Sequence, residues 1–223
     1  MDGDMNSAHP SPRRSRRALV VVLGACVAFL AGAAMIFGFG QSRPKSLSLS
    51  VHSHVAAPAV KRLIQNGRTV VELSTKGRNE GGPTTYGDRS DDLLQFELSW
   101  YDIVAKQTYS AQFELPAKKL STFGDDKDHA SIDIVSGPGA DVRVTTPNPE
   151  ALRLVGLRQT DKITPEMDAP VVLLELCAKP VAASQPLAQE LAAGVEDWSR
   201  DRALDQRKRY LASNPAPRSR CAS

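Results

Sequence analysis

Two stretches of the chain alternate between apolar and polar residues, Leu94-Gln95-Phe96-Glu97-Leu98-Ser99-Trp100 and Tyr109-Ser110-Ala111-Gln112-Phe113-Glu114-Leu115. A period of two residues is typical of a β-strand that buries one of its faces. The apolar residues take the even positions of the first stretch and the odd positions of the second. The two strands of a hairpin, connected by 102–107, can therefore turn their apolar faces toward one core.

The flanking sequence predicts further strands of an antiparallel sheet. Strict alternation over 46–55 indicates a half-buried strand, and Asn66-Gly67 favours a type I′ turn before a strand over 69–74. Strands are also expected over 132–135 and 142–145, which flank a likely turn at 136–139, and over 152–157 and 171–177. The last is apolar apart from Glu175 and is expected at the centre of the sheet. The inner face of the first strand is expected to carry Leu47, Leu49, Val51 and Val55.

One amphipathic helix is expected near the C-terminus, begun at Ser184. A polar loop over 77–88 and a short helix over 117–123, begun by Pro116, are also expected. The sequence thus predicts an α+β protein that is mainly antiparallel β, with about seven or eight strands. We expect the β domain over 46–180, the helix over 181–212 and a tail over 213–223. The apolar stripe of the helix consists of Leu187, Leu191, Val195 and Trp198.

The first forty residues predict a segment directed to a membrane. Residues 1–17 contain Arg13, Arg14, Arg16 and Arg17, whereas residues 18–40 contain no charged side chain. A helix of that length rises about 35 Å, which is enough to cross a hydrocarbon core of about 30 Å. The arginines favour a cytoplasmic N-terminus. We therefore expect a single pass through a bacterial inner membrane, a linker over 41–45 and a periplasmic domain.

Three forms of this segment are compatible with the sequence. An uncleaved signal-anchor would remain as a transmembrane helix, whereas cleavage after the small residues Ala31-Gly32-Ala33 would release the domain into the periplasm. Leu23-Gly24-Ala25-Cys26 resembles a lipobox, so lipidation at Cys26 is the third form. All three place the domain outside the cytoplasm.

Most of the formal net charge of +3 comes from this N-terminal segment. The four arginines outnumber Asp2 and Asp4, and residues 41–223 carry 24 basic and 23 acidic side chains. A nucleic-acid-binding domain keeps its excess of basic residues on the folded part. The sequence therefore predicts no nucleic-acid partner.

Two of the three cysteines lie in the part expected to be exported. Cys177 ends an apolar strand, and Cys221 lies near the C-terminus. In an oxidising compartment, a Cys177–Cys221 disulfide would attach the tail to the sheet. The alternative is two unrelated thiols, because spacing alone does not supply the geometry of a bridge.

Side chains that could carry catalysis are few. His52 and His54 share one face of a strand, but two ligands fall short of the three or four of a protein metal site. A Ser–His–Asp set could be assembled only in space, from His52 or His129, and the chain contains no Gly-x-Ser-x-Gly elbow. We therefore expect no enzymatic activity, no metal site and no cofactor.

The residues expected to contact a protein partner lie in turns and at a strand end. Tyr101 falls in the outward register of its strand, and tyrosine is enriched at interaction hot spots. The loop over 77–88 and the turn over 137–139 add exposed backbone. The expected contact residues are Tyr101, Gly81, Gly82, Tyr86, Gly137, Pro138 and Gly139.

Five short motifs follow one another between residues 93 and 159: Trp100-Tyr101-Asp102, Tyr109, Leu115-Pro116, Gly137-Pro138-Gly139 and Val142-Arg143-Val144. In this order they resemble an uncharacterised family of Gram-negative envelope proteins, a domain of unknown function that is often a lipoprotein. Members are often associated with type VI secretion phospholipase effectors as candidate immunity proteins. The resemblance implies a cognate secreted effector as the partner.

The sequence as a whole predicts a membrane-tethered periplasmic domain that acts by binding a protein. Such a domain could occlude the active site of a phospholipase effector at the membrane surface. One alternative is an envelope hydrolase or metal-binding enzyme that uses His52, His54 or His129. Another is a structural subunit of an envelope complex.

Overall fold

The computed structural model describes residues 44, 46–74, 78–85, 93–124 and 128–221. Ser42–Ser223 form one compact unit. No helix among the described residues is both long and apolar enough to span a membrane. The predicted membrane segment over 18–40, the basic residues before it and Tyr86 lie outside the described residues.

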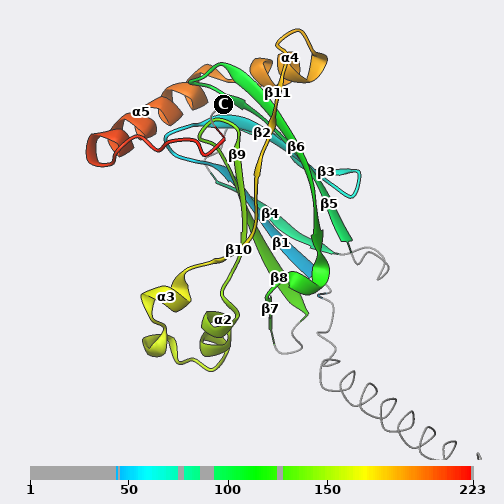
Figure 1. Cartoon of the computed structure of the whole chain (residues 1–223), viewed down its shortest axis with the longest axis vertical. Helices are drawn as coiled ribbons and strands as arrows, with labels where there is room; N and C mark the ends of the chain where they lie inside the picture. Colours follow the sequence, from blue (N-terminus) through cyan, green and yellow to red (C-terminus); the bar gives the residue numbers. More distant parts are fainter. Residues whose placement is uncertain (1–43, 45, 75–77, 86–92, 125–127, 222–223) are drawn as a thin grey trace, which may run out of the picture. The chain divides into compact units, whose positions relative to one another are not determined.

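Two β-sheets pack face to face around an apolar core to which both contribute (Figure 1). Sheet A has the strand order β10-β9-β8-β1-β4, with β7 beside β8, and sheet B has the order β11-β6-β5-β2-β3. The strands of sheet A are β1 (Ser46–Ser53), β4 (Arg78–Thr85), β7 (Thr122–Phe123), β8 (His129–Ser136), β9 (Asp141–Thr146) and β10 (Val171–Cys177). Those of sheet B are β2 (Ala59–Gln65), β3 (Arg68–Ser74), β5 (Leu93–Asp102), β6 (Gln107–Pro116) and β11 (Lys179–Val181).

The predicted hairpin is confirmed as the antiparallel pair β5 and β6. Its alternate residues face the core, where Phe96 stacks on Phe113 with ring centroids 5.2 Å apart and Trp100 stacks on Tyr109 at 5.4 Å. Asp102 closes the turn, because its carboxylate accepts hydrogen bonds from the backbone N–H groups of Val104 and Ala105. The buried apolar residues of these two strands are Leu94, Phe96, Leu98, Trp100, Ala111, Phe113 and Leu115.

Sheet A is built around β1, which lies between β8 and β4. Its inner face buries Leu47, Leu49 and Val51, as the alternation predicts. Val55 was expected on the same face but is 48% exposed, because β1 ends at Ser53 and the chain turns there toward sheet B. β1 runs parallel to β8, so the fold is mainly but not entirely antiparallel.

Most of the loop predicted over 77–88 is the edge strand β4, which pairs with β1. Leu47 pairs with Thr84 and Leu49 with Gly81. Gly82 and Pro83 therefore face Ser48 together, as a β-bulge. Proline lacks a backbone N–H and glycine packs no side chain, so both are tolerated at a bulge in an edge strand. Because glycine and proline are tolerated at such a bulge, an edge strand of this kind has the amino-acid composition of a loop.

β10 confirms a strand over 171–177, but it lies at the edge of sheet A and not at its centre. The chain passes from β10 directly into β11 at the edge of sheet B, so β10 must run where the rims of the two sheets meet. Leu173, Leu174 and Leu176 pack against the core, whereas Val171 and Val172 are exposed. The apolar residues of this strand therefore belong to a rim of the sandwich, where some pack on the core and others are exposed.

The strand predicted over 152–157 is a helix, α2 (Pro149–Gly156). Asn148 caps it by accepting a hydrogen bond from the Glu150 N–H at 2.9 Å, and Pro149 occupies the first turn. An Asn cap followed by proline is a strong helix start, and here it outweighs the apolar run that indicated a strand. A single turn, η2 (Thr160–Lys162), and α3 (Pro165–Asp168) complete the connection to β10.

The expected C-terminal helix is two helices, α4 (Pro186–Ala193) and α5 (Asp197–Ser213), separated at 194–196. The N-cap of α4 is Gln185 and not Ser184, and no side chain makes a capping hydrogen bond there. α4 packs on β2, β5 and β6, and its Glu190 pairs with Arg62 of β2 at 2.9 Å. The short helix expected over 117–123 is a single turn, η1 (Ala117–Lys119).

Lys61 of β2 is a charged residue in a core position. It has no exposed surface and lies opposite Trp100 of β5, in register with the buried Ala59 and Leu63. Burial disfavours the ammonium ion and lowers the pKa of Lys61 from 10.5 to about 8. The sequence analysis missed this residue, because a lysine in a strand is ordinarily assigned to the solvent face.

We expect Lys61 to make stability depend on pH. Its pKa is lower in the folded state, so the unfolded chain binds more protons between about pH 8 and pH 10.5. The free energy of unfolding should therefore rise through this window, by about 2–3 kcal/mol. Urea denaturation near pH 7 and near pH 10 measures the rise. It should be absent from Lys61→Met, and an equal rise in that variant would refute the assignment.

Candidate partner-binding surface

The loops of the sandwich lie at its two ends. The tail end comprises the β1–β2 connection (54–58), the β5–β6 turn (102–107), the β8–β9 turn (137–140), α5 and residues 214–221 (Figure 1). The Ser46 end comprises the starts of β1, β5, β8 and β10, together with η1, β7 and the α2–α3 connection. At the tail end, the His54 N–H donates to the Ser136 carbonyl at 2.8 Å and the Ile103 N–H to that of Pro58 at 3.0 Å.

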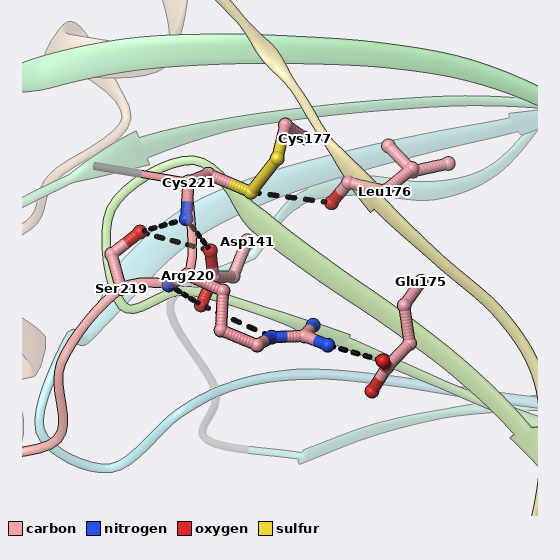
Figure 2. The surroundings of a disulfide bond; sticks show 7 residues. All are labelled: Asp141, Glu175, Leu176, Cys177, Ser219, Arg220 and Cys221. Carbon is pink, nitrogen blue, oxygen red and sulfur yellow. Dashed lines mark hydrogen bonds and ion pairs between the residues drawn. A yellow bond between two sulfur atoms is a disulfide. The ribbon is translucent and has the colours of Figure 1, made fainter. Parts of the chain in front are cut away.

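The C-terminal segment is held by the carboxylate of Asp141, the first residue of β9 (Figure 2). Its Oδ1 accepts hydrogen bonds from the Ser219 hydroxyl at 2.8 Å and from the Cys221 N–H at 3.0 Å, and its Oδ2 accepts one from the Arg220 N–H at 3.0 Å. Asp141 is only 6% exposed. Hydrogen bonds to a carboxylate are roughly twice as strong as neutral ones, so this contact fixes the path of the tail.

A disulfide between Cys177 and Cys221 joins the same segment to the end of β10, with the Cα atoms 5.5 Å apart (Figure 2). This confirms the predicted bridge. Beside it, the Arg220 guanidinium pairs with Glu175 of β10, and Glu175 also lies 3.5 Å from Arg143 of β9. The tail is therefore bound to two strands of sheet A by a covalent bond, hydrogen bonds and ion pairs.

Two glycines allow close packing at the β8–β9 turn. Gly139 has a φ of +61°, and a Cβ there would lie 3.3 Å from the Ser219 Oγ. Gly137 has a φ of +78°, and a Cβ there would lie 3.1 Å from the Cβ of Ala57. The turn is thus packed between the tail on one side and the β1–β2 connection on the other.

α5 crosses this end of the sandwich with few contacts to it. Arg207 donates from Nε to the Ala56 carbonyl at 2.9 Å, and Tyr210 meets the ring of His54 edge-on, with centroids 5.6 Å apart. Burial, with a smaller contribution from the charge of His52, lowers the pKa of His54. The exposed side chains of the helix include Arg202, Lys208 and Arg209.

Exposed apolar side chains lie among the charged ones at the tail end. Val55 is 48% exposed, Val104 is 41% exposed and Leu204 of α5 is 37% exposed. The loops of Val55 and Val104 are neighbours, because the Ile103 N–H bonds to the Pro58 carbonyl. An apolar area rimmed by polar and charged residues is typical of a protein-binding surface.

The predicted contact residues do not gather at one place. Gly137, Pro138 and Gly139 lie at the tail end, half-buried beside the tail. Tyr101 is on the outer face of sheet B, as its register predicts, but it is half-buried. α4 packs on the strands β2, β5 and β6 of the same sheet. Gly81 and Gly82 belong to the edge strand β4, and Tyr86 lies outside the described residues.

His52 and His54 each have a partner other than a metal. The Nδ1 atom of His52 lies 3.1 Å from Asp133 Oδ1, and Nδ1 of His54 accepts a hydrogen bond from the Ala56 N–H at 3.1 Å. In the part of the chain that the structure describes, no three His, Cys, Asp or Glu side chains are grouped so that they could hold a metal ion.

His129 lies between a hydroxyl and a carboxylate at the Ser46 end. Ser46 faces it across the parallel β1–β8 pair, and the Ser46 hydroxyl hydrogen-bonds to His129 Nδ1. Asp128 Oδ1 lies 3.3 Å from His129 Nε2. Gly124, with a φ of +91°, packs over the ring, since a Cβ there would come within 2.9 Å of Cδ2. Only the strand pairing reveals Ser46, which is 83 residues away in sequence.

Comparison with protein families, curated proteins and solved structures finds no match to this chain. The function is therefore argued from the residues of the chain itself.

Removing the disulfide should destabilise the domain. Cys177→Ala with Cys221→Ala opens a crosslink that spans 44 residues, and closing such a loop is worth about 4 kcal/mol in the chain-entropy model. We expect the free energy of unfolding to fall by about 2–4 kcal/mol in urea denaturation without reductant. Cys26→Ala is the control, because it leaves the tail attached. A similar loss in the control would contradict the assignment.

Proposed function

We propose that the chain is a membrane-tethered periplasmic binding protein that acts through a protein partner, a secreted effector whose active site it occludes. The observation that carries the proposal is the tail end of the sandwich. There, Asp141 and the disulfide hold the tail, and exposed apolar and basic side chains lie at the same end. The proposal assigns no catalytic step to the chain.

The cysteines support a location outside the cytoplasm. Disulfides persist in oxidising compartments such as the periplasm and are rare where thiols are kept reduced. Four arginines before the uncharged stretch over 18–40 favour the same orientation, with residues after 40 on the periplasmic side. The two observations are independent and point to one compartment.

The rigidity of the tail end supports binding. Ordering loops and side chains at the moment of association costs affinity, so a surface fixed beforehand binds more tightly. At this end the disulfide, three hydrogen bonds to Asp141 and the Arg207–Ala56 bond hold the tail and α5 before any partner arrives. Val55, Val104 and Leu204 supply the apolar contacts.

Occlusion requires shape and proximity but no chemistry. A firm end of a sandwich can fill an active-site cleft, and a membrane tether raises the local concentration of the binder where a phospholipase acts. The resemblance of residues 93–159 to an envelope family associated with type VI secretion phospholipase effectors supports this class of partner. An immunity protein of this kind is expected beside the gene of its effector.

Val55→Asp with Val104→Asp should weaken binding of the neighbouring gene product by at least about tenfold, because two exposed apolar contacts become charged. Calorimetry with the full chain in detergent measures the dissociation constant. Val155→Asp with Leu157→Asp is the matched control, since these residues are 52% and 53% exposed at the opposite end. The control should bind as the wild type does.

Two results would refute the proposal. One is the absence of any binding between the wild-type chain and the neighbouring gene product. The other is an equal loss of affinity in both double variants, which would place the contact elsewhere or report unfolding. Circular dichroism of each variant separates these last two causes.

A second candidate function, an envelope hydrolase, is favoured by one specific observation. The groups around His129 are those of a serine hydrolase triad with the two ring nitrogens exchanged, because the Ser46 hydroxyl bonds to Nδ1 and Asp128 lies near Nε2. In this candidate, His129 takes the Ser46 proton as Ser46 Oγ attacks an ester carbonyl, and Asp128 orients the imidazole.

A fluorophosphonate probe tests this second candidate, because it reacts only with an activated serine. A hydrolase should be labelled at Ser46, and His129→Ala and Asp128→Asn should each lose the label. Ser131→Ala, another serine in sheet A, should keep it. If the wild-type chain takes no label under native conditions, the arrangement around His129 is structural.

A further inference from the structure

We infer that the Ser46 end of the domain lies against the phospholipid surface of the membrane that anchors the chain. The inference rests on the proposed function in one respect, the uncleaved tether over 18–40. It adds a second binding surface, which is distinct from the tail end, and its partner is a phospholipid bilayer.

Exposed apolar side chains gather at the Ser46 end. Val155 and Leu157, at the end of α2, are 52% and 53% exposed and are the most exposed large apolar residues in the described part of the chain. Val171 and Val172, at the start of β10, are 39% and 41% exposed, and Leu93, at the start of β5, is 39% exposed. Apolar side chains that project from a domain in this way mark a binding surface.

Strand pairing places these residues at one end of the sandwich. Leu93 pairs with Pro116, directly before η1, and Val171 pairs with Thr146, directly before the α2 connection. α2 in turn contacts β7, which pairs with the start of β8. Figure 1 shows α2, α3 and β7 together beyond the start of β1. The start of β1 is also where the chain enters the domain.

The length of chain before the domain limits how far this end can be from the membrane. Only residues 41–43 separate Gly40, the last residue of the uncharged run, from Pro44, which is buried. Four residue steps span at most about 14 Å even when fully extended. The Ser46 end is therefore confined to the headgroup region and its immediate surroundings, whereas a longer linker would let the domain turn freely.

The charges at this end favour a contact that depends on apolar side chains. The described segments 117–119, 128 and 149–168 together contain five basic and five acidic residues. Glu150 and Arg153 already pair at 2.6 Å. The charges of these described segments therefore give no net attraction to anionic lipids, unlike the polybasic segments that require them. We therefore expect the contact with zwitterionic lipid as well, and little effect of salt.

With such a short linker, even a weak contact between the Ser46 end and the lipid is enough to keep this end at the membrane surface. A short linker gives an effective concentration in the millimolar range, so a surface with little affinity in free solution is occupied when tethered. Valine and leucine side chains at an interface supply contacts of this strength. The tail end then points away from the bilayer, toward proteins in the periplasm.

Methyl NMR of the full chain in nanodiscs tests the inference. The nanodiscs contain phosphatidylethanolamine and phosphatidylglycerol, with a small fraction of lipid that carries a nitroxide on its headgroup. The methyl signals of Leu93, Val155 and Leu157 should lose most of their intensity, whereas those of Val55 and Val104 should keep it. In Val155→Asp with Leu157→Asp, the Leu93 signal should recover.

Three other outcomes are informative. Equal broadening of all five residues would overturn the inference, because it means that the domain tumbles freely above the bilayer. Broadening that disappears in phosphatidylcholine nanodiscs or at high salt would also overturn it, in favour of an electrostatic contact. Broadening confined to Val55 and Val104 would reverse the orientation.

The failure of the tether is distinguishable from the failure of the contact. An intact mass of the protein isolated from membranes shows whether residues 1–40 are retained. A mass without them would refute the tether, and with it this inference, while leaving partner binding at the tail end to its own test. A retained segment with uniform broadening would refute only the contact with lipid.

Discussion

The structure depends on the burial of two apolar faces against each other. The β5–β6 pair presents Leu98 and Trp100, and the β1–β8 pair presents Leu49 and Ile132, all essentially without exposed surface. Because side chains alternate along a strand, this burial leaves every second residue on an outer face. It also sends the connections to the two ends of the sandwich, where the chain has room for α2, α5 and the tail.

The alternation of apolar and polar residues was enough to predict the core strands. It failed for β4, for residues 152–157 and for the position of β10. The β5–β6 hairpin was predictable because its apolar face is continuous over seven residues on each strand. The strand β4 was not, because a bulged edge strand carries the glycines and proline of a loop. The apolar residues of 152–157 indicate a strand, whereas the Asn148-Pro149 helix start before them decides the structure. The rim position of β10 follows from the path of the chain into β11, which a single segment does not reveal.

The candidate surfaces were less predictable than the fold, because they combine residues that are distant in sequence. The count of cysteines left the Cys177–Cys221 bridge as one of two possibilities, and nothing in the sequence marked Asp141, which holds the same tail. The register of Tyr101 predicts the outer face of its strand, but not that the residue is half-buried. The turn over 137–139 was predictable, whereas its position beside the tail was not. The exposed residues that carry both proposals, such as Val104 and Leu157, sit in loops and at helix ends, where no periodicity marks them.

Both edges of both sheets are irregular. In sheet A, β4 contains a bulge at Gly82 and Pro83, and the pairing of β10 shifts register at Leu173. In sheet B, the pairing of β3 shifts register opposite Leu63, and the short β11 contains Pro180. A regular edge strand can pair with an edge strand of another molecule and so start aggregation, whereas an irregular edge strand pairs poorly. The proposed tether would confine many copies of the domain to one plane, where collisions between edges are frequent. The four interrupted edges would then keep a crowded layer of these domains from joining sheet to sheet.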